Sequence, residues 1–126
     1  MSSIAGENSP GILIVEDNLV IRMDLVDQAE RDGFTVFEAG TADQAIAILE
    51  AHRDIRLVFT DIEMPGSMDG LKLAAYIRDR WPPIKLMVAS GKIACRDSDL
   101  PEGGLFFAKP YNPALVSKAM HSLLAT

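Results

Sequence analysis

Three carboxylates, one hydroxyl and one amine stand directly after short apolar runs of this sequence. Glu16 and Asp17 follow GILIV, Asp61 follows RLVFT, Ser90 follows IKLMVA and Lys109 follows LFFA. In an open sheet of parallel strands, ligands bind beyond the carboxyl ends of the strands, so residues at these ends lie at one edge. If the apolar runs are strands of one sheet, the spacing predicts that the five side chains share a single site.

The chemistry of this set points to phosphate. Crowded carboxylates repel one another and are driven toward protonation unless a cation neutralises them. Mg²⁺ suits such ligands, because it binds through one or two carboxylates, keeps several waters and takes phosphate oxygens as further ligands. A cation beside Asp61 and the Lys109 amine opposite would stabilise a transferring phosphoryl group, with Asp61 as the nucleophile. The Ser90 hydroxyl could donate a hydrogen bond to a phosphate oxygen. Taken alone, each residue could equally be a helix cap or a solvated loop residue.

The elements that must position these residues alternate as strand and helix along almost the whole chain. This alternation predicts an α/β fold, a doubly wound five-stranded parallel sheet with helices on both faces. With strand order 2-1-3-4-5 the third strand is central, and the fifth is about 10 Å from Asp61, a gap that needs a long charged side chain such as Lys109. The expected strands cover residues 11–15, 35–38, 56–60, 84–89 and 105–108, and the expected helices cover 19–31, a segment after Thr41, 71–79 and a last segment from Asn112 onward.

Local signals mark where helices begin and where the pattern weakens. Asn18, Thr41 with Gln44, and Asn112 are expected to cap helices. The segment from Ser90 to Gly104 breaks the alternation, because it is rich in proline, glycine and acidic residues. We therefore expect a shortened fourth helix there. Residues 1–9 are expected to form a flexible arm, and residues 10–126 a single domain.

Composition narrows the class of function. The net charge is −6 and the pI is near 4.8, which argues against direct binding to nucleic acid, since phosphate contacts need clustered Lys and Arg. No apolar run approaches the roughly 20 residues that span a bilayer, and the first residues do not resemble a signal peptide. We therefore expect a cytoplasmic protein without a membrane partner. The sole cysteine, Cys95, is interpreted as a partly buried thiol, and His52 and His121 are not expected to bind metal.

Four motifs give the sequence a family resemblance. The runs ILIVEDN, LVFTDIEMPGSMDG, MVASG and FFAKPY resemble the receiver family of bacterial response regulators, the CheY-like proteins. The similarity extends from Gly11 onward, and the motifs fall in order on the expected strand ends. It implies a flavodoxin-like fold and a receiver domain over residues 10–126.

The resemblance also implies a metal site. Asp61 would be the phosphoacceptor. Asp17 and Asp61 would bind Mg²⁺ directly, together with the backbone carbonyl of Glu63, and Glu16 would act through water.

Further residues would handle the phosphoryl group. Ser90 would be the switch hydroxyl, and Lys109 would pair with the phosphoryl oxygens. The Lys109-Pro110 bond would be cis. Phe106 occupies the position of the switch aromatic but lacks the hydroxyl of the tyrosine often found there, and a core-packing role is the alternative. An ion pair between Glu63 and Lys92 over the phosphoryl group, against two solvated charges, is a further hypothesis.

The implied function is that of a phosphoacceptor in two-component or phosphorelay signalling. A histidine kinase or histidine phosphotransfer protein would supply the phosphoryl group, and phosphorylation would switch protein contacts. The chain would assist its own phosphorylation and dephosphorylation without being an enzyme in its own right. We expect a stand-alone response regulator, with an unidentified downstream protein target and a phosphorylation-dependent homodimer as an open alternative.

Two other classes remain in view. An aspartate-nucleophile phosphatase would also use an Asp at a strand end with Mg²⁺, although such enzymes usually enclose their substrate under a cap for which this chain has no room. A structural interaction domain that has lost phosphorylation is the third alternative, and the complete set of residues argues against it.

Overall fold

A computed structural model of the chain describes residues 9–66, 68–91 and 103–125. Of the arm expected over residues 1–9, residues 1–8 lie outside the described residues. So do Lys92, which was the expected partner of Glu63, Cys95, and most of the segment expected to hold a shortened fourth helix.

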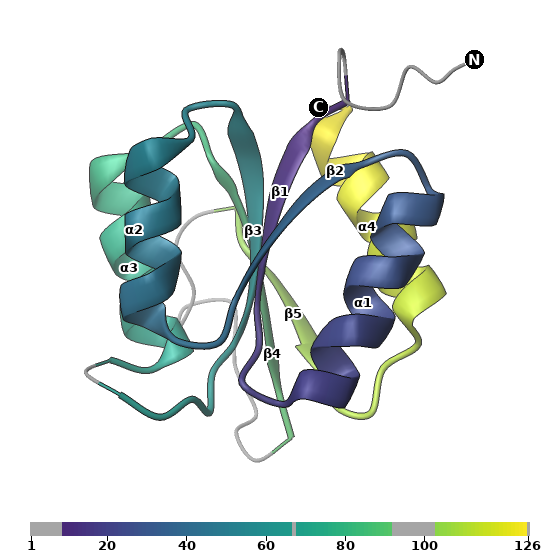
Figure 1. Cartoon of the computed structure of the whole chain (residues 1–126), viewed down its shortest axis with the longest axis horizontal. Helices are drawn as coiled ribbons and strands as arrows, with labels where there is room; N and C mark the ends of the chain where they lie inside the picture. The colour runs from purple at the N-terminus through teal and green to yellow at the C-terminus, as the bar shows by residue number, and fades with distance from the viewer. Residues whose placement is uncertain (1–8, 67, 92–102, 126) are drawn as a thin grey trace.

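The strands form one parallel sheet in the predicted order, β2-β1-β3-β4-β5. Figure 1 shows the sheet edge-on between two layers of helix, which makes the fold the expected flavodoxin-like α/β arrangement. The elements are β1 (Gly11–Val15), α1 (Leu19–Arg31), β2 (Thr35–Ala39), α2 (Ala42–Ala51), β3 (Ile55–Asp61), α3 (Gly70–Arg80), β4 (Lys85–Ser90), β5 (Leu105–Ala108) and α4 (Pro113–Leu124).

Strand boundaries differ from the sequence prediction by one residue at several ends. β3 begins at Ile55, where the ladder to Gly11 starts, and β4 begins at Lys85, because Ile84 N–H donates to the Trp81 carbonyl in a turn. Both strands also run one residue further than expected. Asp61 pairs with Ala89, so the residues predicted to follow these strands are their last members.

Helix capping explains why the helices start where they do. Oδ1 of Asn18 accepts from the Ile21 N–H at 3.0 Å, and the Thr41 hydroxyl accepts from the Gln44 N–H at 3.2 Å. Asn112 caps α4 ahead of Pro113. These predicted caps are confirmed, and Asp69 adds a fourth by accepting from the Lys72 N–H at 2.9 Å. Each cap satisfies a backbone donor that the first helical turn leaves unpaired.

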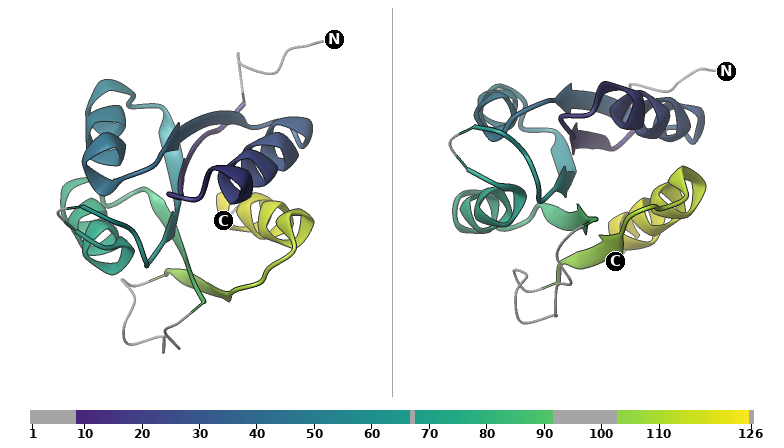
Figure 2. Two further views of the ribbon diagram at one scale, coloured as in Figure 1. Left: turned by 60° about the horizontal axis from the view of Figure 1, so that its bottom comes forward. Right: turned by 90° about the horizontal axis from the view of Figure 1, so that it is seen from below.

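The core has two halves, one on each face of the sheet. Alternate residues of β1 point to opposite sides, as a strand requires: Leu13 packs with α2 and α3, and Ile14 packs with α1 and α4. The two views of Figure 2 show the same pairing of helices. Burial on both faces explains why β1 is a continuous apolar run with all five residues buried. None of the helices in the described parts of the chain is long and apolar enough to cross a membrane.

Candidate functional site at the carboxyl edge of the sheet

The predicted site residues meet at the carboxyl ends of β1, β3, β4 and β5, the lower edge of the sheet in Figure 1. Parallel registers bring them together, because Val15 pairs with Thr60 and Asp61 pairs with Ala89. Glu16, Asp61 and Ser90 are buried, whereas Asp17 is exposed. The prediction that residues at the ends of these strands lie close together is therefore confirmed.

Lys109 crosses the sheet edge from β5 as predicted. Its Nζ lies 3.0 Å from Oδ2 of Asp61 and 3.2 Å from Oε1 of Glu16. The Lys109-Pro110 peptide bond is cis, as the family resemblance implied. One amine thus neutralises part of the charge of two buried carboxylates.

The carboxylates form a cluster that could hold a metal ion. One oxygen from each of Glu16, Asp17 and Asp61 lies within 4.8 Å of the others. Oδ1 of Asp61 is buried and accepts no hydrogen bond from any residue that the structure describes. A buried carboxylate oxygen without a donor is costly, and a hard divalent cation would satisfy it. The donor set therefore fits Mg²⁺.

Comparison with known proteins decides the family. The family model of the response regulator receiver domain matches residues 12–119. The chain belongs to this family.

Individual relatives agree with this assignment. The chain is 37% identical over 123 residues to the aerobic respiration control protein ArcA of Escherichia coli (strain K12), a match that covers 93% of this chain and 49% of ArcA. It is 36% identical over 84 residues to the sensor kinase CckA of Brucella abortus (strain 2308), covering 66% of this chain and 9% of CckA. The chain thus spans about half the length of ArcA and a small part of CckA. The crystal structure of a response regulator receiver protein from Sinorhizobium medicae WSM419 has a TM-score of 0.86 at 24% identity, over 94% of this chain and 97% of that one, which supports the fold.

Burial dominates the electrostatics of the receiver's acidic site. It raises the pKa of Glu16 to about 7, with the hydrogen bond from the Asn18 N–H opposing the shift and the charge of Asp61 adding to it. Burial also raises the pKa of Asp61, and the hydrogen bond from Lys109 only partly offsets it. For Lys109, burial alone would lower the pKa, but Asp61 and Glu16 reverse the sign and raise it. Without a cation, this site therefore favours uptake of a proton by Glu16.

Arg22 supports the acidic pair from α1, and the sequence analysis did not identify it. Its Nη1 donates to the backbone carbonyl of Glu16 at 2.8 Å, and its Nε donates to Oε1 of Glu38 at 2.9 Å. The available signal was its position four residues after the Asn18 cap, which brings it back over the start of the helix.

Glu63 makes a contact that the sequence analysis also missed. Its carboxylate accepts a hydrogen bond from the Ser90 Oγ at 2.5 Å and another from the Gly91 N–H at 3.2 Å. The hypothesis of an ion pair with Lys92 concerns a residue outside the described part of the chain, and the role of the Glu63 backbone carbonyl as a metal ligand stays a prediction.

Other singled-out residues lie away from the acidic cluster. Phe106 is half-buried and packs against the core beneath α2 and α3, so both its switch role and its core role stay open. His52 packs on Phe37, and His121 packs on Phe34, each with ring centroids 4.4 Å apart. These contacts give both histidines a structural role.

Two surface cavities differ in how close they lie to the acidic site. The larger, about 640 Å³, lies at the opposite end of β3 and β4 and includes none of the five predicted residues. The smaller, about 350 Å³, lies between the start of α1 and the loop after β5, and Lys109 is part of its wall. Of these two cavities, only the smaller adjoins the acidic site, through Lys109.

Proposed function

We propose that the chain accepts a phosphoryl group on Asp61 in two-component or phosphorelay signalling. The observation that carries this proposal is the meeting of three carboxylates, the Ser90 hydroxyl and the Lys109 amine at one edge of the sheet in a receiver-family chain. Phosphoryl transfer needs positioning and charge stabilisation more than covalent help from the protein, and this set provides both.

The nucleophile is an oxygen of the Asp61 carboxylate. With a phosphohistidine donor, this oxygen forms a bond to phosphorus, the phosphorus–nitrogen bond breaks, and the imidazole leaves with the electron pair and takes up a proton. Lys109 is already within hydrogen-bond distance of Asp61, so its charge can remain close to the phosphoryl oxygens throughout. The product is an aspartyl phosphate on this chain and a free histidine on the donor.

Mg²⁺, when bound, supplies positive charge beside the phosphoryl oxygens. Asp17 and Asp61 would hold it directly with the backbone carbonyl of Glu63, and Glu16 would act through water. The unpaired Oδ1 of Asp61 and the oxygens clustered within 4.8 Å support this assignment. Lys109 faces Asp61 and Glu16 and remains available to the phosphoryl group.

The affinity for Mg²⁺ is expected to weaken about tenfold from pH 8 to pH 6, because a carboxyl group that titrates between these two pH values binds a proton in competition with the cation. The group responsible is Glu16, whose pKa is raised to about 7. Isothermal titration calorimetry at the two pH values measures the effect. In Glu16→Gln, binding should be weaker and its dependence on pH much smaller. Equal affinities at both pH values in the native chain would contradict this assignment.

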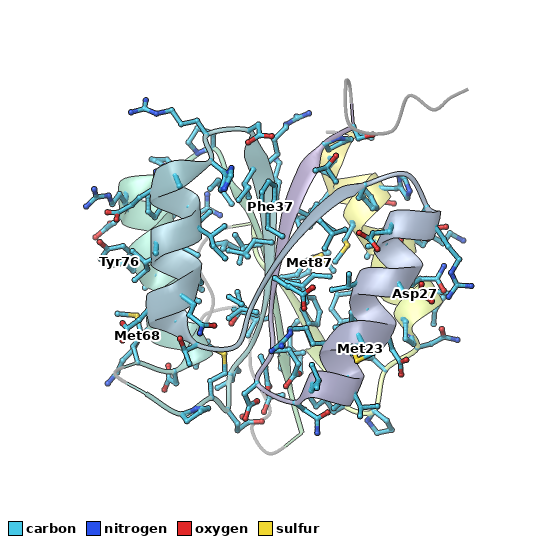
Figure 3. The ribbon with its side chains drawn as sticks, in the orientation of Figure 1. Met23, Asp27, Phe37, Met68, Tyr76 and Met87 are labelled. Atoms are coloured by element: carbon cyan, nitrogen blue, oxygen red, sulfur yellow. The ribbon has the colours of Figure 1, made fainter. Side chains whose placement is uncertain are left out.

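The donor is proposed to dock on α1. Leu19, Val20 and Met23 are 57%, 68% and 58% exposed, which is unusual for large apolar side chains on one short stretch of helix. Figure 3 labels Met23 on the lower part of α1, toward the same edge of the sheet as the acidic site. An apolar helix of a histidine kinase or phosphotransfer protein could cover this surface and bring its phosphohistidine to the edge near Lys109.

Met23→Glu is expected to slow transfer from a phosphohistidine donor by about tenfold or more, because it places a charge in the proposed interface. Phosphorylation by acetyl phosphate should be unchanged. Ala75→Glu, at an exposed position of α3 on the other side of the sheet, is the matched control. Equal effects of the two substitutions on transfer from the protein donor would rule out docking on α1.

The function itself is tested with acetyl phosphate. The native chain is incubated with Mg²⁺ or with a chelator, and intact mass is recorded. The proposal expects one acid-labile phosphoryl group per chain with Mg²⁺ and far less with the chelator. Steady hydrolysis of unrelated phosphate esters would favour the phosphatase alternative. Failure to form an adduct from both acetyl phosphate and a phosphorylated histidine phosphotransfer protein would refute the proposal.

A further inference from the structure

The carboxylate of Glu63 is held by two donors at the end of β4. The Ser90 hydroxyl donates to Oε2 at 2.5 Å, and the Gly91 N–H donates to Oε1 at 3.2 Å. The distance of the first contact is at the short end of the range for a hydroxyl that donates to a carboxylate. Ser90 is 2% exposed, so its hydroxyl is held toward Glu63 in a largely dry environment.

The same two donors lie at the carboxyl end of β4, beside the strand that ends in Asp61. Asp61 pairs with Ala89 in the sheet, and Ser90 and Gly91 are the next residues along β4. The Ile62 N–H also donates to the Ala89 carbonyl at 2.8 Å, which ties the start of the loop carrying Glu63 to this strand. A hydroxyl and a backbone N–H that converge on one anion form a site that suits phosphate oxygens as well as a carboxylate.

We propose that the Glu63 carboxylate is an internal competitor of the phosphoryl group for the Ser90 hydroxyl and the Gly91 N–H. This inference rests on the proposed function of Asp61. In the unphosphorylated chain, Glu63 occupies both donors. When Asp61 receives a phosphoryl group, its oxygens take these donors and their negative charge repels Glu63, which must turn away.

The competition has a direct kinetic consequence. Phosphoryl uptake must break two hydrogen bonds to a charged group before Ser90 and Gly91 can stabilise the incoming oxygens. Glu63→Ala removes the competitor and leaves both donors in place. We expect its uptake of phosphoryl from acetyl phosphate to be about tenfold faster than that of the native chain, the effect of about one charge-assisted hydrogen bond.

A double-mutant cycle separates this competition from simple charge repulsion. The rates of uptake from acetyl phosphate with Mg²⁺ are measured by intact mass for the native chain, Glu63→Ala, Ser90→Ala and the double variant. If Glu63 acts through the donors, its removal has a much smaller effect when Ser90 is already alanine. If it acts only through its charge, its removal accelerates uptake equally in both backgrounds, and the proposal is wrong. Asp79→Ala, which removes an exposed acid on α3, should leave the rate unchanged.

A second measurement, by NMR, detects the hydrogen bond between the Gly91 N–H and the Glu63 carboxylate without any phosphoryl transfer. The amide proton of Gly91 in the unphosphorylated chain should move upfield in Glu63→Ala, because it loses its acceptor. An unchanged Gly91 resonance would refute the contact on which the proposal depends. Failure of all four proteins to form an adduct would refute the proposed function together with the competition, whereas adducts formed at equal rates by the native chain and Glu63→Ala would refute the competition alone.

Discussion

Replacing Asp61 with asparagine is expected to abolish phosphoryl uptake and, in the absence of Mg²⁺, to raise the thermal stability of the protein. The amide is not a nucleophile toward phosphorus under these conditions, so no adduct should form. The gain in stability follows from burial, which raises the pKa of Asp61. The ionised form is therefore less favourable in the folded chain than in the unfolded chain, and the neutral amide avoids this cost. The amide oxygen can still accept a hydrogen bond from Lys109.

The sign of the pH dependence makes the second effect testable. A carboxyl with a raised pKa in the folded state costs nothing well below its ordinary pKa of 3.8 and destabilises the fold increasingly as the pH rises above it. The melting temperature of Asp61→Asn should therefore exceed that of the native chain by more at pH 8 than at pH 4. Added Mg²⁺ should stabilise the native chain more than the variant, because the variant lacks one of the ligand charges.

Asp27→Asn is the control for both effects. Figure 3 labels Asp27 on α1, where it forms an exposed pair with Arg31. Loss of this exposed carboxylate should change neither phosphoryl uptake nor, by more than a small amount, the melting temperature. An adduct on Asp61→Asn equal to that on the native chain would show that another residue is the acceptor.

The sequence was sufficient to predict the sheet order and the residues at its carboxyl edge. The positions of the strands follow from local patterns, namely apolar runs, helix caps and the polar residue after each strand. The order of the strands followed from the doubly wound fold class and the family resemblance. Asp61 and Ser90 fall on neighbouring strands for this reason, and the reach of Lys109 follows from the strand spacing. The one-residue errors at strand ends arose because a strand ends where its ladder hydrogen bonds stop, and the sequence does not show these bonds.

Contacts made by loop side chains were beyond the sequence. The side chain of Glu63 was expected to pair with Lys92, and the path of the loop places its carboxylate on Ser90. The contact with Ser90 joins residues 27 positions apart. Arg22 presents the same difficulty, because its link to Glu38 depends on how α1 lies against β2. Such contacts follow from tertiary packing and leave no periodic signal.

The first residue of α3 illustrates a steric requirement that the sequence also hid. Gly70 N–H donates to the carbonyl of Ile62 at 2.9 Å, so the helix starts directly against the backbone that follows the phosphoacceptor candidate. A Cβ at this position would lie 2.1 Å from the carbonyl oxygen of Asp61 and 2.8 Å from the Cα of Ile62. Both atoms belong to the backbone, so no side chain can turn away to make room.

Gly70→Ala is therefore expected to destabilise the fold by about 3 kcal/mol, at the upper end of the range for overpacking, even though alanine favours helix by about 1 kcal/mol. The midpoint of urea unfolding measures the loss. Gly91→Ala is the matched control, because its Cβ would meet Lys109 at an ordinary 3.5 Å. If Gly70→Ala remains folded, it should also accept a phosphoryl group more slowly than the native chain, since any relief of the clash must shift the backbone of Asp61 relative to Lys109. Equal midpoints for the two glycine variants would show that α3 can move away from β3 at little cost, and the acidic site would then be less rigidly positioned than these contacts indicate.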